Sequence, residues 1–172
     1  METIQLKKLI YNHYDLDVNN LKKLNGYDTE NFLVHCKDES NYILKKYPFS
    51  NENLSLVKAE NNCLEYLRKR NKSSYPSPIY TTNKDSFVTV KIKSKKYIVR
   101  LLSYLDGVFL GELDLKRQDL KKVGRFIGNL SKELKNYSND SIASRKWPWD
   151  IQNLSLNKKY LKYIPDPNDR KI

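Results

Sequence analysis

Apolar and polar residues alternate over short segments in the first part of the chain, which is the pattern expected of half-buried β-strands. The alternating runs are residues 21–24, 31–36, 41–46, 86–91 and 96–102. Asn25-Gly26 and the polar segment 37–41 separate the first three runs and have the composition of turns. We therefore predict about five strands in an antiparallel sheet joined by short connections.

Apolar residues recur with a period near 3.6 in other segments, which predicts helices. The clearest helix is 51–70, whose apolar stripe is Leu54, Val57, Ala59, Cys63, Leu64 and Leu67. A shorter helix is expected at 4–14, and two more at 119–136 and 143–161. One long helix between the third and fourth strands, followed by a helical second part, indicates an α+β fold.

The third run contains a lysine with apolar neighbours. With a side-chain period of two, Ile43, Lys45 and Tyr47 lie on one face of this strand. A lysine placed among apolar side chains requires an anionic partner, because an unpaired buried charge is very unfavourable. An ordinary lysine at the edge of a sheet would show the same residue type, so the position alone does not decide between the two interpretations.

Three carboxylates in the following helix are candidate partners for Lys45. Glu60 precedes Cys63 on the side of the helix expected to pack, whereas Glu65 has Lys69 four residues later and is explained by a surface pair. Glu52 is the third candidate. We expect Glu60 to orient Lys45.

Two further segments have the residues of a ligand site. The turn from Gly26 to Asn31 offers backbone N–H groups that can bind an anion, although it also carries Asp28 and Glu30 and fits a plain hairpin turn. The segment Leu101–Gly107 runs from a strand into a turn, where backbone groups of Ser103 and Leu105 would be exposed to a ligand.

Taken together, Gly26-Tyr27-Asp28-Thr29-Glu30-Asn31-Phe32, Tyr42-Ile43-Leu44-Lys45 and Val99-Arg100-Leu101-Leu102-Ser103-Tyr104-Leu105-Asp106-Gly107 resemble the phosphotransferase enzyme family. That family includes aminoglycoside phosphotransferases and hydroxylysine kinase. The likeness runs from about residue 16 to about residue 153. It implies a protein-kinase-like N-lobe that binds ATP, in which a strand lysine held by a helix glutamate positions the phosphates. The implied ATP-binding residues are Gly26, Asn31, Ile43, Lys45, Glu60, Ser103 and Leu105.

In this resemblance the turn closes over the phosphates, Ile43 covers the adenine ring, and Ser103 and Leu105 present backbone groups to its edge. Residues 1–105 correspond to the N-lobe, and residues 106–172 to the first helices of a C-lobe truncated before the catalytic loop. Mg²⁺ is the implied second cofactor, yet its ligands and the catalytic residues of the family are missing. We therefore expect little or no phosphotransfer by this chain alone.

One short motif imitates a kinase catalytic loop. His13-Tyr14-Asp15 followed by Asn20 fits the H-x-D-x-x-x-x-N pattern, but it precedes the phosphate turn instead of following the hinge. No D-F-G or D-[FW]-G-D segment follows it. We therefore do not interpret it as catalytic. Trp147-Pro148-Trp149-Asp150 resembles the tryptophan-bearing helix near the acceptor side of the family, but we interpret its rings as core packing.

The formal net charge of +12 suggests an acidic partner, and nucleic acid is one alternative. Lysines and asparagines are scattered and acids lie between them, so we assign the charge to composition and consider nucleic-acid binding unlikely. Two cysteines without CxxC spacing, and His13 and His35 without ligand spacing, predict reduced thiols and no zinc site.

Without a run of about 20 apolar residues or a signal sequence, we expect a cytoplasmic protein that does not enter a membrane.

Three hypotheses follow for function. The first is part of a small-molecule kinase whose C-lobe is a separate polypeptide, with a small hydroxylated amine or amino acid, such as hydroxylysine, as acceptor. It predicts exposed apolar faces on 120–134 and 147–161. The second is a nucleotide-binding module without catalysis. The third is a basic nucleic-acid-binding protein, which predicts a contiguous basic face and salt-sensitive affinity.

Overall fold

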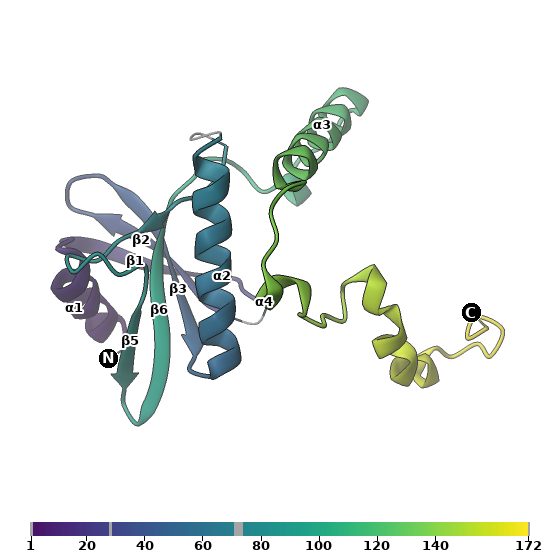
Figure 1. Ribbon diagram of the computed structural model, residues 1–172, viewed down its shortest axis with the longest axis horizontal. Coiled ribbons are helices and arrows are strands. Elements are labelled where there is room, and N and C mark those ends of the chain that lie inside the picture. The colour runs from purple at the N-terminus through teal and green to yellow at the C-terminus, as the bar shows by residue number, and fades with distance from the viewer. Residues whose placement is uncertain (1, 28, 71–73, 172) are drawn as a thin grey trace.

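The computed structural model describes residues 2–27, 29–70 and 74–171 and has the expected α+β architecture. Its first part contains α1 (Glu2–Tyr14), β1 (Val18–Leu24), β2 (Glu30–Cys36), β3 (Asn41–Pro48), α2 (Asn51–Arg68), β4 (Pro78–Ile79), β5 (Val88–Ile92) and β6 (Lys95–Ser103). Its second part contains η1 (Leu110–Glu112), α3 (Arg117–Leu134), α4 (Asp140–Ala143) and η2 (Ile151–Tyr163). Figure 1 shows α2 lying along the sheet and the second part extending to one side of it.

The sheet is antiparallel and has the order β1-β2-β3-β6-β4, with β5 also paired to β6. Five strands were expected, and the sixth is the two-residue strand β4, in a segment interpreted as a loop. β4 pairs with Leu101 and Leu102 of β6, whereas β5 pairs with the earlier residues 95–99. The two short strands therefore share one edge, and the number of strands across the sheet is as predicted.

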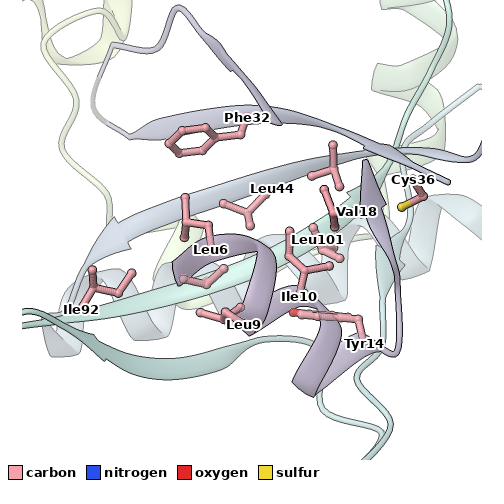
Figure 2. Close-up of a cluster of buried hydrophobic side chains, with 12 residues drawn as sticks. Leu6, Leu9, Ile10, Tyr14, Val18, Phe32, Cys36, Leu44, Ile92 and Leu101 are labelled. Carbon is pink, nitrogen blue, oxygen red and sulfur yellow. The ribbon is translucent and has the colours of Figure 1, made fainter. Parts of the chain in front are cut away.

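Helix α1 covers one face of the sheet and forms the main core with it. Figure 2 shows Leu6, Leu9 and Ile10 of α1 directed toward Leu44 of β3 and Leu101 of β6. Period-two alternation places these strand residues on the same face, which is why this surface of the sheet is apolar. Leu6 and Ile10 are fully buried, so the short first helix is an integral part of the fold.

Helix α2 covers part of the opposite face. Its Val57 packs with Tyr47 of β3 and Ile98 of β6 in a second buried cluster. The helix begins after Ser50, whose hydroxyl accepts a hydrogen bond of 3.0 Å from the Asn53 N–H and caps the first turn. The rest of this face, beyond the helix, remains available for a site.

The second part of the chain packs only lightly on the first. Tyr137 contacts Tyr66 with ring centroids 4.9 Å apart, and Phe126 contacts Tyr75 at 5.9 Å. In the described residues, α3, α4 and η2 contain no buried side chain. The segment 143–161 was expected to be helical, with Pro148 at a helix start or kink. It contains a turn around Pro148 and then the 3₁₀ segment η2, so it is not an α-helix. No helix in the described part is both long and apolar enough to cross a bilayer.

Candidate nucleotide site

A cavity of about 700 Å³ lies on the α2 side of the sheet, between strands β1 to β3 and the segment that follows β6. Its volume is in the ~300–1,000 Å³ range of small-molecule sites. Five of the seven residues predicted from the sequence line it: Asn31, Ile43, Lys45, Ser103 and Leu105. Other lining residues include Lys22, Leu24, Leu33, Leu102, Asp106 and Phe109. The structure therefore brings together most of a site whose members are far apart in the sequence.

Lys45 lies at the centre of this arrangement. It is half-buried on β3, and its cross-strand neighbours are Asn31 on β2 and Arg100 on β6. Its Nζ lies 5.7 Å from the centroid of the Tyr47 ring. A cation fixed on a central strand, with one side open to a cavity, is suited to binding an anionic ligand.

Glu60 lies on α2 and pairs with a cation of β6. Its carboxylate forms an ion pair with the guanidinium of Arg100, a residue that the sequence analysis did not single out. Glu60 is the residue expected to hold Lys45, and the ion pair that it forms is with the cation directly across the β3–β6 pair from Lys45. A signal for Arg100 exists in the sequence, because Ile98 and Leu102 flank it on its own face just as Ile43 and Tyr47 flank Lys45.

Gly26 is also absent from the cavity lining, but it shapes the turn above it. A Cβ at Gly26 would lie 2.2 Å from the Thr29 carbonyl oxygen and 2.6 Å from the Asn31 side-chain nitrogen. Only glycine therefore lets the chain fold this closely around Asn31. Asp28, the first of the two acids noted in this turn, lies outside the described residues.

Glu30, the second acid of the turn, connects the turn to the sheet. Its carboxylate lies 2.6 Å from the Nζ of Lys46 and 3.0 Å from that of Lys23. The hydrogen bond from Lys46 is the main cause that holds the pKa of Glu30 below its usual value, with Lys23 adding to it. The acid that seemed unsuited to an anion-binding turn thus neutralises lysines of β1 and β3.

The segment after β6 is held by Ser77. The Ser103 N–H donates to the Ser77 carbonyl, and the Ser77 N–H donates to the Ser103 hydroxyl, both at 2.9 Å. The amide of Ser103, one of the two expected to face a ligand, is therefore engaged in the fold. Leu105, the other, is exposed at the cavity.

The remaining motifs lie elsewhere. His13 and Tyr14 belong to α1, which covers the opposite face of the sheet, so the kinase-like pattern does not reach the cavity. The core interpretation of Trp147 and Trp149 is wrong, because Trp149 is 72% exposed and both rings contact Tyr27 in the turn that follows β1. Across the described residues, no group of three or more His, Cys, Asp or Glu side chains could hold a metal.

The sheet is antiparallel and has one long helix on one face, and a cavity lies between the sheet and the segment that leaves its last long strand. This is the architecture of a kinase-like small lobe. Comparisons with known proteins agree with this class. The chain is 25% identical over 185 aligned residues to hydroxylysine kinase of Mus musculus, and 28% identical over 182 to that of Xenopus laevis. Each alignment covers 98% of this chain and 48% of the relative.

Two solved structures share the fold. An amicoumacin kinase in complex with AMP-PNP, Ca²⁺ and Ami matches with a TM-score of 0.69 at 16% identity, over 97% of this chain and 48% of that one. A microcompartment-associated aminopropanol kinase matches with a TM-score of 0.65 at 20% identity, over 87% and 46%. No protein-family model matches the sequence. The resemblance to phosphotransferases is confirmed, over the N-terminal part of these proteins, and the chain spans about half their length.

Proposed function

We propose that this chain is the nucleotide-binding part of an ATP-dependent kinase that phosphorylates a hydroxyl group of a small molecule. The observation that carries the proposal is the cavity that gathers Asn31, Ile43, Lys45, Ser103 and Leu105 beneath the turn. Residues 1–105 form the ATP-binding lobe, and residues 106–172 begin the helical lobe. The phosphates lie against Lys45 and the turn, and the adenine lies between Ile43 and the backbone at Leu105.

The residue types in the cavity suit both the base and the phosphates of a nucleotide. Ile43, Leu33 and Leu102 provide an apolar surface for a planar base. Lys45 and Lys22 supply positive charge for phosphates, and the Asn31 amide adds a hydrogen-bonding group next to Lys45. Backbone groups fix the base edge without demanding a particular side chain, which fits Leu105 at that position.

Mg²⁺ is the second cofactor that the proposal implies, because it neutralises phosphate charge in phosphoryl transfer. Asp106 is the carboxylate at the cavity, and it alone does not make a metal site. We propose that the part of the relatives that this chain does not span supplies the metal ligands and the catalytic base. Residues 1–172 alone are then expected to bind ATP with little or no turnover.

We propose a hydroxylated amine or amino acid as the acceptor, by likeness to relatives named for hydroxylysine and aminopropanol. A C-lobe polypeptide is the proposed protein partner. Large apolar side chains stay exposed where it would pack, including Leu120, Ile127, Ile151 and Leu154. Both cysteines are free thiols, which agrees with a reducing compartment, and we retain the cytoplasm as the expected location.

The experiment that tests the proposal is calorimetric titration of residues 1–172 with ATP and Mg²⁺, using wild type, Lys45→Ala and Lys95→Ala. Lys95 is an exposed lysine of β6 outside the cavity and serves as the matched control. Loss of a charge-assisted contact to phosphate should weaken binding about tenfold or more in Lys45→Ala. Equal affinities of wild type and Lys45→Ala would contradict the proposal.

A further inference from the structure

Arg100 is the most deeply buried charged residue near the proposed site. It lies on β6 with 1% of its surface exposed, between Ile98 and Leu102 on its own face of the strand. A guanidinium in such a place depends on hydrogen bonds and on a paired charge for its stability. In the described residues its Nη1 and Nη2 have partners, whereas its buried Nε has none. The partners of Nη1 and Nη2 therefore reveal what Arg100 organises.

Three side chains from two elements accept hydrogen bonds from Arg100. Its Nη1 donates to the Asn61 side-chain oxygen, and its Nη2 donates to the Tyr47 hydroxyl at 2.7 Å and to the Glu60 carboxylate. Asn61 is itself held in place, because its amide nitrogen donates to the carbonyl and the hydroxyl of Ser86. The network joins the middle of α2 to the centre of the sheet.

We infer that Arg100 is a positioning residue that anchors Glu60 and helix α2 to the sheet. The planar guanidinium presents several N–H donors in fixed directions, so one arginine can bond acceptors from two elements at once. Two neighbouring cations then have separate roles. Arg100 holds helix α2 against the sheet, and Lys45 binds the phosphates of the ligand in the cavity. The role of Lys45 rests on the proposed function, whereas the role of Arg100 does not.

The anchoring role is tested by a double-mutant cycle in folding stability. Urea unfolding is measured for wild type, Arg100→Met, Glu60→Gln and the double variant, with Lys95→Met and Glu65→Gln as matched controls on the same two elements. Glu60→Gln leaves the buried charge of Arg100 without its carboxylate, and Arg100→Met leaves the partly buried Glu60 without its cation, so the effects should not add. Multiplying the two single-variant effects gives the folding equilibrium constant expected of the double variant if the residues were independent. We expect the measured constant of the double variant to be at least about fivefold larger than this product. Additive effects would overturn the inference.

The separation of roles is tested by a second cycle, in ATP affinity, between Lys45→Met and Glu60→Gln. If Arg100 holds Glu60, the two fold-changes in affinity should multiply to within about twofold, as for independent sites. If Glu60 instead acts through Lys45, Glu60→Gln should have no further effect once Lys45 is replaced, and that result would overturn the inference. A loss of folding stability caused by Glu60→Gln would change ATP affinity by the same factor whether residue 45 is lysine or methionine.

Tyr47→Phe provides a milder variant if Arg100→Met does not fold. It removes only the hydroxyl that accepts from Nη2, the same nitrogen that pairs with Glu60. Tyr47→Phe and Glu60→Gln should again be non-additive in stability, and additivity would overturn the inference. If wild type fails to bind ATP, the proposed function fails, while the stability cycles still decide whether Arg100 is the anchor.

Discussion

At the scale of single residues, the two buried cations Lys46 and Arg100 are each paired with a carboxylate from another element. Lys46 is 2% exposed and is neutralised by Glu30, which lies opposite it in the β2–β3 register. Arg100 is neutralised by Glu60, 40 residues away in the sequence. The requirement that a buried cation has a partner was evident in the sequence, but the identity of the partner depends on how α2 lies on the sheet.

Glu30 gives this pairing a pH dependence. Its pKa is lowered in the folded state, so its contribution to stability is full above the unfolded pKa of ~4.3 and is lost as pH falls through the folded value. Between about pH 5 and pH 3, urea midpoints should fall more steeply for wild type than for Glu30→Gln. Glu52→Gln, at an exposed position of α2, is the control. Parallel curves for wild type and Glu30→Gln would contradict this account.

Gly26 controls the shape of the turn. In Gly26→Ala the new methyl group would meet the Thr29 carbonyl and the Asn31 side chain, so the turn must move away from Asn31. We expect ATP affinity to fall several-fold while the melting temperature changes little, because the described residues of the turn are not part of the buried core. Gly111→Ala, where the added carbon meets nothing within 4 Å, should leave the affinity unchanged. Unaltered ATP binding by Gly26→Ala would show that the turn does not cover the ligand.

At the scale of elements, periodicity found most of the long elements, including α3, which has no buried residue in the described chain. The strands and helix α2 were found within a few residues, because each has one face that must be buried. Strand β4 was missed, because a strand of two residues, one of them a proline, is too short to show an alternating pattern. The helix expected at 143–161 is a 3₁₀ segment with no buried residue in the described chain, so packing does not select one helical form.

The candidate site was predictable to a similar degree. Lys45, Ile43 and Asn31 were assigned by the family resemblance, and the β2–β3 register places Asn31 beside Lys45. The engagement of the Ser103 amide by Ser77 could not be foreseen, because it depends on β4 reaching the edge of β6. Tyr27 against Trp147 and Trp149 likewise requires the C-terminal segment to return to the turn, which no local pattern encodes.

At the scale of the whole molecule, the first part has a core and the second part does not. Helix α3 leaves Leu120 56% and Ile127 55% exposed, and Ile151 of η2 is 86% exposed. A hollow of about 610 Å³ beside η2, lined in part by Leu154, Tyr160 and Leu161, adds to this apolar surface. Surfaces of this kind are covered in stable proteins, which is consistent with relatives about twice as long.

This surface should make the isolated chain associate or bind apolar dyes. Replacing Leu120 and Ile127 by lysine should reduce the fluorescence of a bound apolar dye and lower the mass measured by light scattering. The melting temperature should stay within a few degrees of wild type, because both side chains are already exposed. Lys121→Ala, on the same helix, is the control. A monomeric wild-type chain with no dye binding would contradict this view of the second part.

The central claim is that Lys45 lies beside the phosphates of a bound nucleotide. An acyl phosphate of ATP acylates a lysine amine that contacts the bound phosphates, and peptide mass mapping identifies the modified residue. The account predicts modification of Lys45 that an excess of ATP prevents, with surface lysines such as Lys95 modified equally in both conditions. Unprotected modification of Lys45, or none at all while the nucleotide is bound, would contradict it.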